Sequence, residues 1–300
     1  MAGGGEERNQ RRGTWQPYAM LSPGMLWMAL FFFAPMVILA RYALSEPRDR
    51  FSGKYDLTWR FENFTEVFDR YGEQFLRSFR YSGIATLLCI ALGYPLAYWI
   101  ATRGGRYRNL LLGLVVVPFF TSYLVRTIAW TTLVGDEGPI LGIAGALSLE
   151  GALDSIGITT NGGLLQTQTA VILGLTYNFL PFMVLPIYVS LEKIDFRLLD
   201  AAKDLYSSSR RAFWKVIFPL SLPGVFAGTL LTFIPASGDF VNAEFLGGPN
   251  NQMIGNVIQN EFFVQFDFAS AAAISFILMF IITVGVLVYA RIFGTDELSV

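Results

Sequence analysis

The stretch from Phe268 to Ala290 reads FASAAAISFILMFIITVGVLVYA, 23 residues without a single charged side chain. The hydrocarbon core of a lipid bilayer is about 30 Å thick, and an α-helix needs about 20 apolar residues to cross it. This stretch therefore predicts a membrane-spanning helix near the C-terminal end of the chain.

Five further stretches of the 300-residue chain have a similar length and composition. They are Met20 to Ala40, Tyr81 to Ala101, Leu110 to Val134, Ala170 to Leu191 and Val216 to Gly238. Arg126 is the only charged residue inside any of them. We therefore expect an all-α integral membrane protein with six transmembrane helices. Residues 1–14 would form a tail, and residues 15–300 would form a single transmembrane domain.

The overall composition excludes several functional classes. Only 15% of the residues are charged, against about 25% in soluble domains, and 53% are hydrophobic. There is no histidine and only one cysteine, Cys89, which excludes histidine-based acid–base catalysis, zinc sites of Cys and His, and an internal disulfide. No GxxxxGK[ST] loop occurs in the chain, so we expect no ATP site of that kind, no metal and no cofactor in this chain. The net charge of −1 gives no reason to expect a nucleic-acid partner.

Lys and Arg are distributed unevenly between the loops, and short loops rich in these residues stay on the cytoplasmic side of a membrane. The basic loops carry Arg103, Arg106 and Arg108, and then Lys193, Arg197, Lys203, Arg210, Arg211 and Lys215. Residues 135–163 and 239–267 contain acidic residues but no Lys or Arg. We therefore expect both termini to be cytoplasmic. The segment from Arg41 to Arg80 would then lie outside, although it carries eight basic and seven acidic residues.

The segment from Glu192 to Leu220 shows two helical stripes, which are separated by three consecutive serines. Apolar residues recur with helical spacing at Leu198, Ala201, Ala202 and Leu205, and again at Phe213, Val216, Ile217 and Leu220. An amphipathic helix on the cytoplasmic face fits a groove on a soluble partner. It fits equally well a position on the membrane surface, with its Lys and Arg among the lipid headgroups.

The same segment resembles the EAA loop, the signature of permease subunits in binding-protein-dependent ABC importers. Residues 200–207 read DAAKDLYS, and residues 213–224 read FWKVIFPLSLPG. Asp200 stands where the family usually has Glu. Tyr206 stands where it usually has Gly, so the turn must form without a residue that enters the left-handed region freely. The resemblance implies that an ATPase subunit grips a coupling helix here. The coupling residues would be Leu198, Asp200, Ala201, Ala202, Leu205 and Tyr206.

Three other parts of the chain resemble the permeases of spermidine/putrescine importers, the PotB-type family. They are GYPLAY at 93–98, PFFTSYLVRT at 118–127, and IPASGDF at 234–240 with LGGP at 246–249 and IGNVI at 254–258. The resemblance implies the type I ABC importer permease (MetI-like) fold in the cytoplasmic membrane of a bacterium. It also implies alternating-access transport of a polyamine. The implied partners are a second six-span permease, an ATPase dimer that binds ATP and Mg, and a soluble binding protein. Another small cationic or zwitterionic substrate stays open.

Asp239 is the first candidate for contact with such a substrate. A polyamine requires carboxylates for its ammonium groups and aromatic faces for cation–π contacts. Asp239 lies at or just beyond the outer end of the fifth span, next to Phe240 and five residues before Glu244. In the family this region lies along the translocation path, so the resemblance implies a substrate contact for all three. The residue pattern alone also allows acids that cap a helix end or lie in a solvated loop.

Two polar residues of the fourth span, Tyr177 and Asn178, are further candidates for the substrate path. A polar group in an apolar helix either lines a cavity or makes a hydrogen bond to a neighbouring helix.

Arg126 lies near the outer end of the third span, and its positive charge opposes a direct contact with a polycation. We expect it to pair with an acid such as Asp136, Asp239 or Glu244, or to extend toward the outer interface.

The sequence argues against two other functional classes. A stand-alone secondary transporter or channel usually has buried carboxylates at mid-membrane or inverted repeats, and neither pattern is visible in the sequence. A membrane-embedded enzyme needs paired carboxylates or a base. Asp239 is the only acid close to membrane depth, so the sequence favours a transport subunit without catalysis of its own.

Overall fold

The computed structural model describes residues 16–48, 55–146, 162–195 and 208–293, with the isolated residues 151, 154, 157–159 and 197 between them. Within these ranges five helical stretches are long and apolar enough to cross a membrane. They contain the helices α2 (Gln16–Ala43), α3 (Glu62–Arg103), α8 (Gln168–Glu192), α11 (Phe218–Ser237) and α13 (Phe268–Phe293). These five agree with five of the six expected spans, although α3 begins 19 residues before the expected Tyr81.

The third expected span, Leu110 to Val134, is broken, and it makes a sixth span when its two bent helices are taken together. The chain forms α4 (Arg108–Val116) and the 3-10 turn η2 (Val117–Phe120), and then α5 (Tyr123–Val134) at a bend of 94°. Pro118 lies at the start of η2 and lacks the N–H that would continue the helix. Thr121 and Ser122 have extended ψ angles of 143° and 136°, which end one helix before the next begins.

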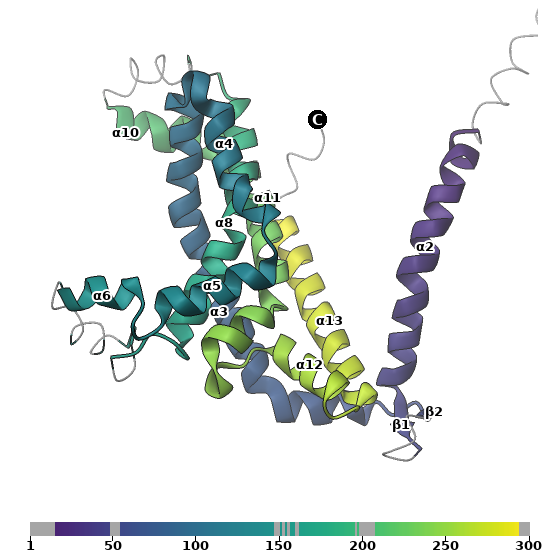
Figure 1. Cartoon of the computed structure of the whole chain (residues 1–300). Coiled ribbons are helices and arrows are strands. Elements are labelled where there is room, and N and C mark those ends of the chain that lie inside the picture. The colour runs from purple at the N-terminus through teal and green to yellow at the C-terminus, as the bar shows by residue number, and fades with distance from the viewer. Residues whose placement is uncertain are drawn as a thin grey trace, which may run out of the picture.

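The core of the bundle is formed by α8, which packs against α3 and α11 (Figure 1). Cys89 of α3, Ile187 of α8 and Ile217 at the start of the fifth span are fully buried in one hydrophobic cluster. The contact between α8 and α11 depends on a glycine, because a Cβ atom at Gly224 would lie 2.5 Å from the carbonyl oxygen of Pro186. Small residues at such positions let the backbones of two membrane helices approach closely.

The short elements divide between the two ends of the bundle. One end carries η1 (Gly105–Tyr107), α10 (Ser209–Ala212) and the π-helix η3 (Phe213–Ile217). The other end carries α6 (Pro139–Ala146), the π-helix η4 (Ala243–Gly247), η5 (Pro249–Asn251), α12 (Ile254–Phe263) and the strands β1 (Ser45–Pro47) and β2 (Tyr55–Leu57). By the distribution of charge, the first end is the expected cytoplasmic side. In Figure 1 it lies at the top, where α2 also begins.

A small antiparallel hairpin joins α2 to α3, with Ser45 opposite Leu57. Arg60 follows the hairpin and forms ion pairs with Glu46 at 3.2 Å, Glu62 at 3.3 Å and Glu66 at 2.6 Å. One arginine is thereby shared by three carboxylates of this segment.

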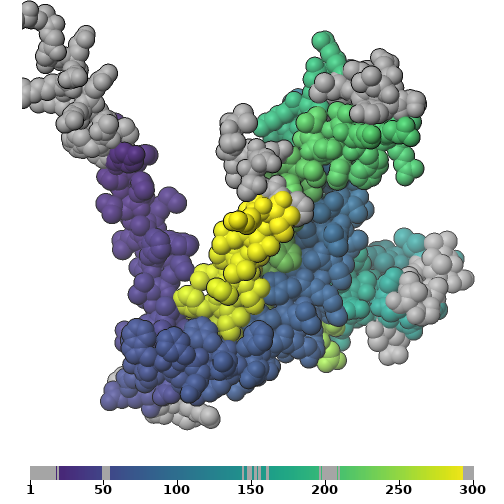
Figure 2. Space-filling model, turned by 180° about the vertical axis from the view of Figure 1, so that it is seen from behind, coloured from purple at the N-terminus to yellow at the C-terminus, as the bar shows by residue number. Residues whose placement is uncertain are grey.

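The helix α2 stands apart from the other spans (Figure 2). It contacts the bundle through α13 and the hairpin, and its most apolar 18-residue window contains no buried residue. Its apolar surface is therefore available to lipid or to another protein chain.

Candidate functional site

The most polar part of the interior lies directly after α11, where the chain leaves the bundle. The helix ends at Ser237, and the backbone N–H of Asp239 still donates to the carbonyl of Ala236 at 3.3 Å. The side chain of Asp239 is only 8% exposed. A buried carboxylate is expensive unless it is hydrogen-bonded, so its partners decide what it can do.

Both carboxylate oxygens of Asp239 accept hydrogen bonds from neutral donors. Oδ1 accepts from the backbone N–H of Asn242 at 2.8 Å and from its Nδ2 at 3.2 Å. Oδ2 accepts from the hydroxyl of Tyr123 on α5. Burial raises the pKa of the Asp239 carboxyl above its usual value, and the hydrogen bonds from Tyr123 and Asn242 oppose that rise.

Asn178 of α8 connects the fourth span to this site. Its Nδ2 donates to Asn242 Oδ1 at 3.1 Å and to Thr127 Oγ1 at 3.3 Å. The side chain of Asn178 is 1% exposed, and its Oδ1 has no hydrogen-bond partner among the described residues. We call the five residues Tyr123, Thr127, Asn178, Asp239 and Asn242 the Asp239 cluster. It joins α5, α8 and the segment after α11.

Three members of the Asp239 cluster, Tyr123, Thr127 and Asn242, are not among the site residues predicted from the sequence, and the first and last of them are the direct partners of the carboxylate. A signal for each of these two partners was present. Asn242 follows Asp239 by three residues, which is close to one helical turn. Tyr123 follows the Thr121–Ser122 break and faces inward because α5 changes direction there.

Phe240 and Glu244 lie beside the Asp239 cluster rather than within it. Phe240 is 41% exposed, and the carboxylate of Glu244, also exposed, accepts a hydrogen bond from Asn256 Nδ2 at 3.0 Å. The same Nδ2 donates to the Phe240 carbonyl at 2.9 Å. Asn256 therefore fixes both residues next to the start of α12.

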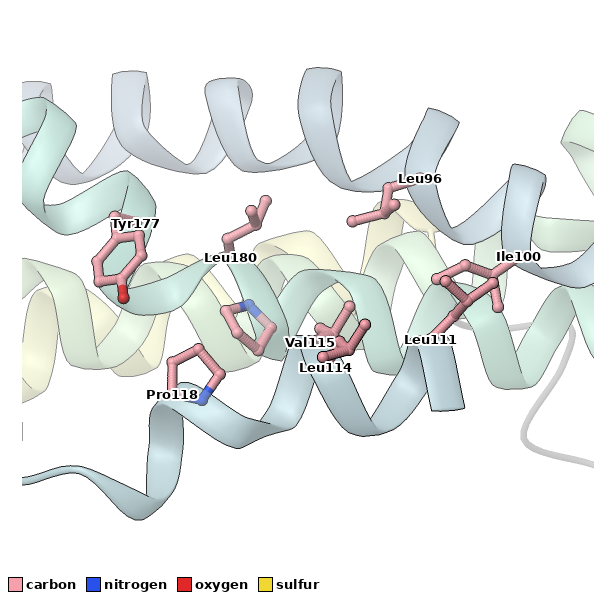
Figure 3. Close-up of a pocket in the computed structure, with 9 residues that line it drawn as sticks. Leu96, Ile100, Leu111, Leu114, Val115, Pro118, Tyr177 and Leu180 are labelled. Carbon is pink, nitrogen blue, oxygen red and sulfur yellow. The ribbon is translucent and has the colours of Figure 1, made fainter. Parts of the chain in front are cut away.

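Tyr177 faces a different space from its neighbour Asn178. Its ring centroid lies 5.3 Å from that of Trp130, and it lines an apolar cavity of about 300 Å³ between α3, α4 and α8. Figure 3 shows Tyr177 and Pro118 at one end of this cavity, and Ile100 and Leu111 at the other. Apart from Tyr177 the lining is apolar, and it contains no charged side chain.

Arg126 forms no salt bridge with any described residue, so the expectation of a pairing with Asp136, Asp239 or Glu244 is wrong for this conformation. It does not extend into solvent either, because it is only 9% exposed. Its guanidinium carbon lies over the rings of Phe119, at 5.0 Å, and Tyr123, at 5.7 Å. The sharp bend at Thr121 and Ser122 turns this side chain inward.

The six residues expected to couple to an ATPase lie outside the described part of the chain: Leu198, Asp200, Ala201, Ala202, Leu205 and Tyr206. The flanking structure is described. The ring of Phe213 lies 6.0 Å from that of Tyr94 and 5.3 Å from that of Tyr98, both on α3. The Tyr94 hydroxyl lies 2.7 Å from Ser221 Oγ. The motifs at 93–98 and 213–224 thus contact each other at the expected cytoplasmic end.

No group of three or more Cys, Asp or Glu residues within the described ranges is arranged to hold a metal ion. The Asp239 carboxylate can pair with a cationic group, or accept hydrogen bonds from it, once its hydrogen bond to Tyr123 or Asn242 is broken.

A sequence profile of the binding-protein-dependent transport system inner membrane components matches residues 93–293. The spermidine/putrescine transport system permease protein PotB of Haemophilus influenzae is 37% identical over 267 residues, which cover 88% of this chain and 90% of that protein. PotB of Escherichia coli K12 is 38% identical over 271 residues, covering 88% and 93%. The inner membrane ABC transporter permease protein YdcU of E. coli K12 is 30% identical over 190 residues, covering 62% and 60%.

Two solved structures share the fold. A bacterial ABC transporter involved in the import of the acidic polysaccharide alginate matches with a TM-score of 0.67 at 17% identity, over 97% of this chain and 99% of that one. The alginate ABC transporter in complex with an alginate pentasaccharide-bound periplasmic protein matches with a TM-score of 0.64 at 18% identity, over 96% and 98%. At these identities the likeness establishes the architecture and says nothing about the substrate.

Proposed function

The chain belongs to the family of binding-protein-dependent transport system inner membrane components, and from that premise we propose that it is the permease subunit of a polyamine importer. It is a multi-pass membrane protein and a transport subunit rather than an enzyme. Spermidine and putrescine are the proposed substrates, because the relatives that match over nearly nine tenths of this chain carry these names. The proposed location is the inner membrane of a bacterium.

The observation that carries the proposal within the chain is the Asp239 carboxylate. It is enclosed at the outer end of α11, in a bundle whose spans are otherwise almost free of charge. A carboxylate in such surroundings attracts an ammonium group strongly because the local dielectric constant is low. The neighbouring ring of Phe240 is exposed enough to cover the methylene segments of a polyamine.

An ammonium group reaches Asp239 only by displacing a donor that is already there. Oδ2 accepts from Tyr123, whereas Oδ1 accepts from Asn242 three residues away in the same segment. The hydrogen bond from Tyr123 links α5 to the segment after α11. A movement of these two elements relative to each other would therefore break it. We propose that opening this bond exposes the carboxylate to the substrate.

The proposed partners are a second permease subunit, an ATPase dimer that binds ATP and Mg, and a soluble binding protein that delivers the substrate. The ATPases would grip residues 192–220 and open and close the permease pair by alternating access. The contacts of Phe213 with Tyr94 and Tyr98 would carry that movement from the coupling segment into α3.

The test is uptake by the complete transporter in proteoliposomes, with ATP inside and the binding protein outside. We expect ATP-dependent uptake of labelled spermidine or putrescine, and competition by the other polyamine but not by glutamate. Asp239→Asn should reduce uptake at least tenfold, whereas the exposed Glu137→Gln control should leave it unchanged. Transport of neither polyamine by the native complex would overturn the proposal.

A further inference from the structure

Arg126 is a buried cation that forms no ion pair with any described residue. Its side chain is 9% exposed, and its Nε and Nη1 groups are enclosed yet donate to no described residue. Its only described contacts with charge-stabilising groups are the faces of Phe119 and Tyr123. A buried guanidinium in this condition is costly, so a conformation in which it finds an acceptor is favoured.

A buried carboxylate, that of Asp239, contacts the same tyrosine. The guanidinium of Arg126 lies against the ring of Tyr123, and the hydroxyl of Tyr123 donates to Asp239. Tyr123 therefore contacts two buried groups of opposite charge, each of which has only neutral partners among the described residues. Opposite charges attract strongly where water is excluded, and this attraction favours a conformation in which Arg126 and Asp239 pair directly.

The positions of Tyr123 and Arg126 on α5 permit an exchange. Residues three apart on an α-helix lie on the same face, about 60° apart around the axis and about 4.5 Å apart along it. The helix α5 begins after the extended residues Thr121 and Ser122, and Ser122 makes no side-chain cap bond. A rotation at this joint moves α5 without breaking the hydrogen bonds inside it.

We propose that Arg126 is the internal counter-cation of Asp239, and that it replaces the Tyr123 hydroxyl and competes with the substrate's ammonium group for the carboxylate. This inference rests on the proposed function. The competition weakens substrate binding in one state of the cycle and so promotes release. It also keeps the carboxylate neutralised when no substrate is present, which opposes the leak of small cations.

The other groups around the carboxylate do not offer the same role. Asn242 is neutral, and Glu244 is exposed and bound to Asn256. No Lys or Arg occurs between residues 239 and 267. Among the described residues, Arg126 is thus a positive charge that is linked to Asp239 through a single shared neighbour, Tyr123.

The first test needs no substrate. Structures of the complete transporter in lipid nanodiscs, without nucleotide and trapped with ATP, should show the Arg126 guanidinium within about 4 Å of the Asp239 carboxylate in one of the two states, which is salt-bridge distance. The Tyr123–Asp239 hydrogen bond should be broken in that state. If Tyr123 holds Asp239 in both states, the inference is overturned, whichever substrate the transporter carries.

The second test measures equilibrium binding of labelled spermidine to the membrane complex without its binding protein. Arg126→Gln should bind spermidine about tenfold more tightly than the native complex and release it more slowly, because the competing charge is gone. Arg126→Lys should restore weak binding. Arg126→Gln combined with Asp239→Asn should bind no more tightly than Asp239→Asn alone, since the arginine acts through that carboxylate.

The two tests distinguish a failure of this inference from a failure of the proposed function. Unchanged or weaker binding by a correctly assembled Arg126→Gln complex overturns the inference. If neither the native nor the Arg126→Gln complex binds spermidine, the uptake assay decides the proposed function, and the structural test alone decides the role of Arg126. If the Arg126→Gln complex does not assemble, the two native structures again decide.

Discussion

Asn178 on α8 and Asn242 in the segment after α11 are joined by a hydrogen bond of 3.1 Å, which ties the central helix of the bundle to the residue that holds Asp239. Both side chains are almost completely buried. The position of the carboxylate is therefore set by an amide pair that joins α8 to the segment after α11.

Asn178→Leu should destabilise the chain, because it leaves Asn242 Oδ1 and Thr127 without their shared donor. An unsatisfied buried polar group costs about 1–3 kcal/mol, and interhelical hydrogen bonds in membranes contribute about 0.6 kcal/mol on average. We expect a lower melting temperature of the purified complex in detergent, together with impaired uptake. The matched control is Tyr177→Phe, next to it on α8, which keeps the ring against Trp130. Equal melting temperatures for the two variants would contradict the role given to Asn178.

Gly224→Ala should weaken the packing of α11 on α8. The added Cβ would lie 2.5 Å from Pro186 O and 2.8 Å from Ile187 Cα, so the backbones must separate. Overpacking of this kind costs about 1–3 kcal/mol. Thermal unfolding of the purified complex measures the loss. Gly285→Ala in α13 is the control, since its Cβ would meet no atom within 4 Å. A Gly224→Ala variant as stable as the control would show that the helices separate without cost.

Asp200→Lys should uncouple ATP hydrolysis from transport, because the charge that is proposed to orient the coupling helix is reversed. We expect ATPase activity to persist while uptake in proteoliposomes falls at least tenfold. Glu137→Lys makes the same charge change on the opposite side of the membrane and should leave coupling intact. Normal uptake by the Asp200→Lys variant would contradict a coupling role for Asp200.

The stability of the native chain should decline with rising pH relative to Asp239→Asn. The pKa of Asp239 is raised in the folded state, so the folded state binds its proton more tightly than the unfolded state does. The stability that this group contributes is present below the unfolded pKa of about 3.9 and is lost as pH rises through the raised folded value. Melting temperatures of both proteins from pH 4 to 8 test this. A constant difference between them would show that the hydrogen bonds fully offset burial.

The spans were predictable because the bilayer requires a certain length and a low polarity of each spanning helix, and both can be read directly from the sequence. The stretch from Phe268 to Ala290 needs no partner to be recognised, and the helix α13 covers it. For the third span, the sequence predicted the apolar stretch but not its shape. Its composition is apolar throughout, and hydropathy carries no information about the 94° bend that Pro118, Thr121 and Ser122 produce.

The site was predictable in part. Asp239 and Asn178 stood out as polar residues in apolar surroundings, and the structure brings them within one hydrogen-bonded cluster through Asn242. Tyr177 stood out for the same reason, yet it faces an apolar cavity, because adjacent residues on a helix point about 100° apart. The roles of all the predicted substrate-path residues, Asp239 and Asn178 included, stay predictions, as do those of the coupling residues.

The sequence by itself determined that this chain is a membrane-spanning permease of a known family, since apolar length and contiguous motifs are properties of local sequence. Only the tertiary structure decided which polar groups meet inside the bundle. Tyr123 and Asp239 are separated by 116 positions in the chain, and their contact depends on the bend before α5 and on the packing of α8 against α11. No local pattern in the sequence predicts such a contact, because only the folded arrangement of the helices brings a buried arginine and a buried carboxylate into contact with one tyrosine.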